Sequence, residues 1–108
     1  MAKKMIKQSP LNSRQKKVLR GLSHHLTVKA MLGREGLTDQ VVKSVLAVLA
    51  AHELIKVKVQ ENFPHDRKEA AVMLADKTGA ALVQLVGRII TLYKGNRDLP
   101  EDQRIPLP

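Results

Sequence analysis

Cysteine is absent from this sequence, and aromatic side chains are almost absent. Among its 108 residues there is no Trp, one Tyr and one Phe. Without cysteine the chain has no disulfide framework, no thiolate ligand for a metal and no thiol nucleophile. Because 44% of the residues are hydrophobic, a chain of this length can still bury one modest core. We therefore expect one domain that folds without metals or disulfides.

Long hydrophobic runs are also missing. No apolar stretch of the sequence approaches the roughly 20 residues that span a bilayer. Met1–Gln8 is basic but lacks the apolar core of a secretory signal. We therefore expect a cytoplasmic protein with no membrane partner, which agrees with the lack of cysteine in a chain from a reducing compartment.

Acidic residues are missing from the first quarter of the chain. The net charge is +9, and residues 1–29 hold eight Lys and Arg but no Asp or Glu. The remaining 79 residues hold 11 basic and 10 acidic side chains. Positive charge concentrated in this way indicates a polyanionic partner. The plainer alternative is a solvated face that keeps the protein soluble.

Apolar spacing predicts an α/β two-layer domain with the order helix–strand–helix–strand–helix–strand–strand. Spacings of three and four residues predict helices at about 13–25, 39–52 and 66–78. Short apolar or alternating runs predict strands at 28–32, 55–59, 81–86 and 89–93. Strands alternating with helices predict parallel pairing, and Gly87-Arg88 predicts a final antiparallel hairpin. Right-handed crossovers then place the second and third helices on one face of a four-stranded mixed sheet.

Capping residues and apolar spacing predict where the three helices begin or end and which of their sides face the core. Asn12 or Ser13 caps the first helix and Thr38 the second, because their side chains accept from free backbone N–H groups. Gly79 ends the third helix. The expected inner side of the first helix is Val18, Leu19, Leu22 and Leu26, and that of the third is Ala70, Met73, Leu74 and Lys77.

Composition changes at both ends of this pattern. Residues 1–10 are basic and precede the first helix, so we expect a flexible basic arm there. Residues 95–108 hold three of the five prolines and no apolar period. This composition is typical of an extended tail that lies largely outside the core. The folded domain is therefore expected to span residues 11–94.

The motif Gly33-Arg34-Glu35-Gly36 falls between an expected strand and an expected helix. Two glycines around two residues allow a tight turn and a close approach of another backbone, and the free N–H groups of the following helix attract anions. Single-stranded RNA binders of the KH type clamp the sugar-phosphate backbone with such a loop. A plain strand-to-helix turn is the alternative, and Glu35 would repel phosphate if it pointed inward.

Six stretches of the chain match a known pattern when taken together. They are Leu22–Leu26, Leu32–Thr38, His52–Lys58, Thr78–Ala80, Val83–Arg88 and Ile89–Lys94. In this combination the chain resembles the CRM domain (chloroplast RNA splicing and ribosome maturation) in its stand-alone bacterial YhbY-like form, over roughly residues 11–94. The resemblance implies an RNA-binding fold similar to the C-terminal domain of translation initiation factor 3. Bacterial single-domain members associate with precursors of the large ribosomal subunit, and the family's RNA contact is expected at the glycine loop, here Gly33, Arg34 and Gly36.

Basic side chains near the first helix and the loop are the candidate phosphate contacts. The candidates are Lys16, Lys17, Arg20, Lys29 and Arg34, with Lys56, Lys58 and Arg88 as additional ones. One short strand joins the first helix to the loop, so we expect the two to converge on a single cationic patch. Phe63 and Tyr93 are too few to stack bases on a sheet. The expected mode is therefore recognition of backbone and shape.

The remaining polar residues form no catalytic or metal-binding pattern. The four histidines, at 24, 25, 52 and 65, show no zinc-site spacing, and no Walker loop, dinucleotide fingerprint or nucleophile elbow occurs. We therefore expect a non-enzymatic protein without cofactor, metal or small-molecule substrate. We also expect a monomer, and the resemblance to the CRM domain implies ribosomal RNA or pre-50S particles as its partner. A protein-interaction module for acidic partners and a non-specific DNA-binding protein stay open as alternatives.

Overall fold

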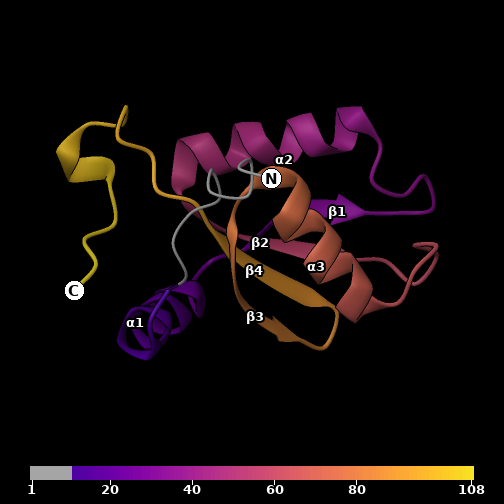
Figure 1. The fold of residues 1–108 in the computed structure, drawn as a ribbon, viewed down its shortest axis with the longest axis horizontal. Coiled ribbons are helices and arrows are strands. Elements are labelled where there is room, and N and C mark those ends of the chain that lie inside the picture. Colours follow the sequence, from indigo (N-terminus) through magenta and orange to yellow (C-terminus); the bar gives the residue numbers. More distant parts are fainter. Residues whose placement is uncertain (1–10) are drawn as a thin grey trace, which may run out of the picture.

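The computed structural model describes residues 11–108, so the flexible basic arm expected at residues 1–10 lies outside the described residues. Three helices and four strands follow in the predicted order (Figure 1). The helices are α1 (Ser13–Ser23), α2 (Asp39–His52) and α3 (Arg67–Thr78), with a short 3-10 helix, η2 (Glu101–Gln103). The strands are β1 (Val28–Leu32), β2 (Leu54–Val59), β3 (Ala81–Val86) and β4 (Ile89–Tyr93).

The strands form one mixed sheet in the order β1-β2-β4-β3. β1 and β2 run parallel and are joined by α2, with Met31 opposite Lys58. β4 lies between β2 and β3 and is antiparallel to both. The connection through α3 therefore leads from β2 to β3, which are not adjacent in the sheet. The hairpin at Gly87 then places β4 between β2 and β3. The predicted fold class, an α/β domain with a four-stranded mixed sheet, is confirmed.

Side-chain caps determine where the helices begin and end. Asn12 Oδ1 accepts from the N–H of Gln15, and Gln15 Oε1 accepts from the N–H of Asn12, so Asn12 is the N-cap of α1. Asp66 and Glu69 form the same reciprocal pair at the start of α3. Gly79 ends α3 with a φ of 73°, a conformation that glycine adopts without steric cost. These local signals explain why the predicted boundaries lie so close to the observed ones.

The main hydrophobic core fills the space between one face of the sheet and the helices α2 and α3. Alternate residues of β2, namely Ile55, Val57 and Val59, are fully buried on this face. Leu49 of α2 and Leu74 of α3 belong to the same buried cluster. Both crossover helices therefore cover one face of the sheet, as predicted.

The opposite face of the sheet is covered by α1 over part of its area. Leu19 of α1, Leu54 of β2, Val83 of β3 and Tyr93 of β4 form a second, smaller buried cluster. Leu54 and Tyr93 are paired neighbours at one end of the sheet. Towards the other end this face is open, and Met31 of β1 is 58% exposed.

Two of the predicted inner positions of the helices are wrong. Leu22 of α1 is 45% exposed, and Lys77 of α3 is exposed. α1 rests on the sheet through a narrow strip whose buried residues are Leu19 and Ser23, so Leu22 lies beside the contact. On α3 the inner position near the end belongs to Thr78, whose hydroxyl donates to a backbone carbonyl one turn earlier at 2.7 Å.

Residues 95–108 fold back onto the domain instead of extending away from it. Ile105 and Leu107 pack against the second cluster beside Leu19. Gln15 Nε2 of α1 donates to the backbone oxygen of Pro108 at 3.1 Å. Figure 1 shows this segment in yellow, running from β4 past the end of α2 towards α1. The expectation of a tail largely outside the core is corrected, because two apolar side chains among the prolines supply a packing surface.

Candidate nucleic-acid interface

Two lysines of β2 lie on the partly covered face of the sheet. Successive side chains of a strand alternate between its faces. Leu54 belongs to the cluster under α1, whereas Ile55 and Val57 belong to the main core. Lys56 and Lys58 therefore project on the α1 side. Lys58 is exposed and Lys56 half-buried, and neither side chain has a hydrogen-bonding or ionic partner among the described residues.

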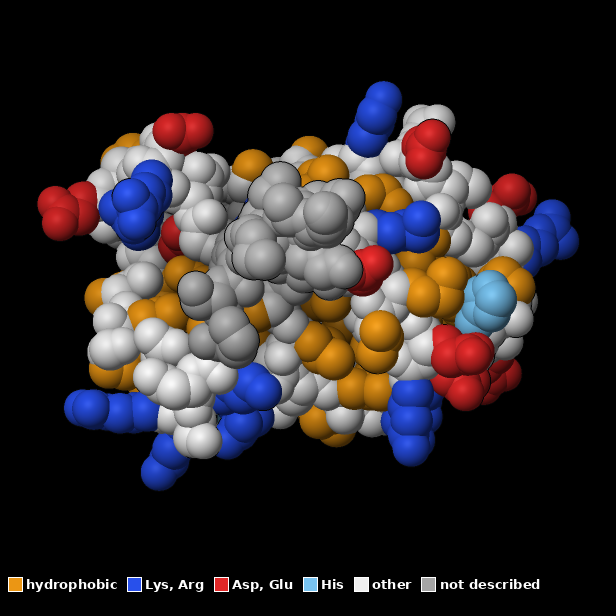
Figure 2. Space-filling view, in the orientation of Figure 1, with side chains coloured by type: hydrophobic (Ala, Val, Ile, Leu, Met, Phe, Trp, Pro, Cys, Tyr) orange, Lys and Arg blue, Asp and Glu red, His pale blue; other side chains and the backbone are white. Residues whose placement is uncertain are grey.

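Helix α1 carries four basic side chains, and three of them are candidate phosphate contacts at one end of this face. Lys17 and Arg20 are exposed and Lys16 is half-buried, and none of them has an ion-pair partner among residues 11–108. Figure 2 shows a group of Lys and Arg side chains at the lower left, where α1 lies, with no acidic side chain among them in this view. This end of the molecule therefore presents positive charge that no ion pair within residues 11–108 offsets.

Lys29 extends this set from the edge strand β1. It is exposed, lies at a register shift between β1 and β2, and lines a hollow together with Leu22 and Leu26 at the end of α1. We define the cationic face as six side chains: Lys16, Lys17, Arg20, Lys29, Lys56 and Lys58. Within the described residues, α1 and the four strands contain no Asp or Glu. No carboxylate of these elements therefore neutralises the cationic face.

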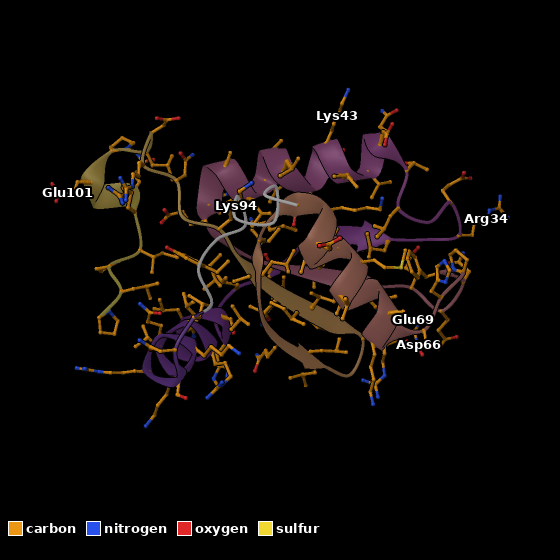
Figure 3. The ribbon with its side chains drawn as sticks, in the orientation of Figure 1. Arg34, Lys43, Asp66, Glu69, Lys94 and Glu101 are labelled. Carbon is orange, nitrogen blue, oxygen red and sulfur yellow. The ribbon has the colours of Figure 1, made fainter. Side chains whose placement is uncertain are left out.

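The glycine loop forms a tight turn at the far end of β1. The N–H of Gly36 donates to the carbonyl of Gly33 at 3.1 Å, which leaves Arg34 and Glu35 at the tip. Gly36 has a φ of 77°, so a side chain there would be strained. Both tip side chains are exposed, and Arg34 points away from the rest of the domain (Figure 3). The predicted turn is confirmed, and its use as an RNA contact stays a prediction.

The glycine loop and α1 lie at opposite ends of β1. α1 precedes the strand and the loop follows it, and five strand residues span about 16 Å. Figure 1 shows α1 at the lower left and the β1–α2 loop at the right. The expectation that the two converge on a single patch is therefore wrong. Lys56 and Lys58, on the strand paired with β1, lie along the path between the two ends.

Charges around the glycine loop are balanced, unlike those of the cationic face. Glu35 stands beside Arg34, and Asp39 occupies the first turn of α2, where its carboxylate interacts favourably with the helix dipole. Thr38 Oγ1 accepts from the N–H of Val41 at 3.2 Å and caps the helix. A phosphate arriving at this end would therefore meet two carboxylates and a helix terminus that is already capped.

Comparison with known proteins agrees with this architecture. Residues 11–94 match the sequence profile of the CRS1 / YhbY (CRM) domain. The chain belongs to the CRM family. The resemblance that the six sequence stretches indicate is thereby confirmed.

Relatives of this CRM chain cover most of its length. A Bacillus subtilis protein named "Probable RNA-binding protein YqeI" is 38% identical over 98 residues, which are 91% of this chain and 99% of the relative. A Haemophilus influenzae protein named "RNA-binding protein" is 39% identical over 98 residues, with 91% and 95% of the two chains covered. The solution structure of a hypothetical Staphylococcus aureus protein, described as a candidate for RNA binding, is similar with a TM-score of 0.74 and 35% identity. That comparison covers 91% of this chain and 99% of the other.

Arg88 of the CRM domain holds the end of β2. Its Nε donates to the carbonyl of Val59 at 2.7 Å, and its Nη2 donates to the carbonyl of Gln60 at 2.8 Å. The N–H of Val59 donates in turn to the carbonyl of Arg88 at 2.8 Å. This candidate RNA contact therefore already has a structural role that uses two of its guanidinium donors.

The aromatic side chains of the CRM domain lie in its interior. Phe63 is buried in the main core and Tyr93 in the second cluster, so neither offers a ring on the open part of the sheet. Within residues 11–108, no group of three His, Cys, Asp or Glu is placed to hold a metal ion. In the same part of the chain, no helix combines the length and apolar character needed to cross a membrane.

Glu53 is the polar residue that sequence reasoning missed. It is 1% exposed, and its carboxylate accepts the backbone N–H groups of Asn96 and Ile105, each at 2.6 Å. Its place directly before the apolar residues Leu54 and Ile55 is a usable signal, because a charged side chain next to the core is buried only with partners. The partners lie 43 and 52 positions away, where no local pattern indicates them.

Proposed function

We propose that this protein binds RNA through the cationic face and contacts the phosphate backbone more than the bases. Lys and Arg side chains that neutralise phosphates release condensed counterions, and this term supplies most sequence-independent affinity. The observation that carries the proposal is a set of six unpartnered cations across α1 and the sheet, elements that contain no acidic residue within residues 11–108. The relatives named as RNA-binding proteins support the choice of RNA among polyanions.

The order of the cations along the sheet suggests a path for the RNA strand. A strand laid from α1 along β2 meets Lys56 and then Lys58, whose backbone positions are about 7 Å apart. Arg34 stands beyond the end of β1 and serves as a further contact at the glycine loop. We expect that contact to contribute less than α1, because Glu35 and Asp39 offset its charge.

The CRM family membership supports ribosomal RNA as the target. Bacterial single-domain members of the family associate with precursors of the large ribosomal subunit. We therefore propose that the RNA is precursor large-subunit ribosomal RNA and that the protein acts in ribosome assembly, in the cytoplasm, as a monomer. The buried positions of Phe63 and Tyr93 favour recognition of backbone and shape over base stacking.

A salt titration with three ligands tests this proposal. Fluorescence anisotropy measures the binding of a structured fragment of large-subunit ribosomal RNA, a duplex DNA of equal length and an acidic peptide. With six phosphate contacts, log K for RNA should fall against log salt with a slope of about −4, and RNA should be the tightest ligand. A shallow slope with a preference for the peptide would favour a protein-interaction module. Equal affinity for duplex DNA would favour a non-specific DNA-binding protein.

A further inference from the structure

Glu53 occupies an unusual backbone position between α2 and β2. Its φ is 64°, and it is the one non-glycine residue with positive φ among the described residues. Its N–H donates to the carbonyl of Leu49 at 2.7 Å, and its carbonyl accepts from the N–H of Lys94 at 2.8 Å. A residue with a Cβ adopts this conformation at a cost, so the surrounding contacts must hold it there.

The Glu53 carboxylate anchors residues 95–108, which we call the strap. Oε2 accepts from the N–H of Asn96 and Oε1 from the N–H of Ile105, both at 2.6 Å, so each carboxylate oxygen holds a different part of the strap. Hydrogen bonds to an ionised acceptor are short and stronger than neutral ones. Asn96 adds a side-chain bond to the carbonyl of Ala50 at 2.8 Å. One buried acid therefore fixes the course of about ten residues of irregular chain.

Gly95, at the start of the strap, lies close to Tyr93 and to the Glu53 carboxylate. A Cβ at Gly95 would lie 3.0 Å from Tyr93 Oη and 3.9 Å from Glu53 Oε2, so a side chain there would require the Tyr93 hydroxyl to shift by a few tenths of an ångström. Burial raises the pKa of the Tyr93 hydroxyl, Glu53 raises it further, and Arg104 of the strap lowers it. The Glu53 carboxylate and Arg104 of the strap therefore both lie close enough to the Tyr93 hydroxyl to affect its pKa.

The far end of the strap contacts α1. Ile105 and Leu107 pack against the cluster that contains Leu19, and Gln15 Nε2 donates to the backbone oxygen of Pro108 at 3.1 Å. Gln15 also belongs to the capping box of α1. The strap thus reaches both the buried side and the first turn of the helix that carries Lys16, Lys17 and Arg20.

Helix α1 meets the sheet through a narrow contact. It has 11 residues, and its buried residues are Leu19 and Ser23. Isolated helices shorter than about 12 to 15 residues are marginal in water, so most of their stability comes from packing. Two of the four partly buried residues that pack against the cluster of Leu19 are Ile105 and Leu107, so the strap contributes to keeping α1 in place.

We propose that Glu53 is a positioning residue for RNA binding, which acts through the strap to hold α1, and with it Lys16, Lys17 and Arg20, against the sheet. This inference rests on the proposed function. For the loss of the Glu53 charge, it predicts a change in RNA affinity opposite to the change expected from net charge alone. Removing a negative charge from the protein should tighten RNA binding, whereas loss of the anchor should weaken it.

The test compares Glu53→Gln with Glu101→Gln in the full chain. The two substitutions change the charge equally, and Glu101 is exposed in η2. In Glu53→Gln, one carboxylate oxygen is replaced by an NH2 group, which donates and cannot accept. One of the two strap N–H groups, that of Asn96 or that of Ile105, therefore loses its acceptor. At fixed salt, Glu53→Gln should lower RNA affinity about fivefold, while Glu101→Gln should leave it equal or slightly higher. Hydrogen exchange of the α1 amides should become about tenfold faster in Glu53→Gln alone.

A second variant keeps the proposal testable if Glu53→Gln does not fold. The pair Ile105→Ala and Leu107→Ala removes packing of half-buried strap residues without touching charge, and it should also weaken RNA binding and speed exchange in α1. Folded variants that bind RNA like Glu101→Gln, with unchanged exchange in α1, would overturn the proposal. If the parent protein bound no RNA, the proposed function would be wrong. The exchange measurement would still show whether the strap holds α1, so the two failures can be distinguished.

Discussion

The two ends of β1 differ in the kind of signal that they carry. At its start, α1 and the lysines beside it present positive charge without any recognisable motif. At its end, the glycine loop presents a recognisable motif, but Glu35 and Asp39 offset the charge of Arg34. The turn itself accounts for Gly36, whose φ of 77° favours glycine. A glycine motif can therefore reflect only the backbone geometry of a turn, whereas positive charge without nearby acidic residues indicates where a polyanion can bind.

The largest expected effect is the loss of Lys16, Lys17 and Arg20, three of the four cations of α1. Changing Lys16, Lys17 and Arg20 together to Ala should weaken RNA binding about fiftyfold at about 0.15 M salt and make the salt slope shallower by about 2, at about 0.7 per phosphate contact. Fluorescence anisotropy across a salt series measures both quantities. The fold should survive, because these side chains are exposed or half-buried.

A matched triple variant controls for the loss of net charge. Lys43, Lys68 and Lys77 are exposed on α2 and α3, the helices that cover the other face of the sheet. Lys43 points away from the domain in Figure 3. Changing these three lysines to Ala should alter RNA affinity and slope much less. Equal losses in the two triple variants would mean that net charge alone attracts RNA and that the cationic face is no site.

The next effect concerns Arg88, at the same end of the sheet as the glycine loop. Arg88→Ala removes two hydrogen bonds from a charged donor to the carbonyls that end β2. It should lower the free energy of unfolding by about 2 kcal/mol, as measured by urea denaturation, and leave the salt slope of RNA binding unchanged. Arg34→Ala, at the exposed tip, should change stability by less than about 0.5 kcal/mol. A shallower slope in Arg88→Ala would instead make Arg88 a phosphate contact.

The smallest effect should come from the glycine loop. Gly36→Ala places a side chain at a positive φ and should lower the free energy of unfolding by about 1 kcal/mol. Gly33→Ala should cost less, because its Cβ would meet the end of the flexible Gln60 side chain. Since neither variant removes a charge, RNA affinity should stay within about twofold of the parent. A loss of affinity as large as that of the α1 variant would show that the loop is the main contact.

Local signals in the sequence account for most of the fold. Thr38, Asp66 and Gly79 mark helix ends through hydrogen bonds and dihedral angles that involve residues close in sequence. Strict alternation in β2 predicts that Lys56 and Lys58 share one face. These features depend on a few neighbouring residues, so the sequence alone is sufficient to find them.

Features that depend on distant contacts could not be found in this way. The spacing of Leu22 fits an apolar stripe, but the spacing does not reveal how narrow the contact between α1 and the sheet is. The strap looks like a tail because its partner Glu53 lies 52 positions before Ile105. The separation of α1 from the glycine loop also follows from three-dimensional geometry, since closeness in sequence across a strand means distance in space.

Lysine footprinting tests the central claim most directly. Acylation of the free protein and of the RNA complex, followed by mass spectrometry, gives the protection of each lysine. We expect RNA to protect Lys16, Lys17, Lys29, Lys56 and Lys58, with Lys43, Lys68 and Lys77 modified equally in both states. Protection confined to the α2 and α3 lysines, or spread evenly over both sets, would contradict a binding site on the cationic face.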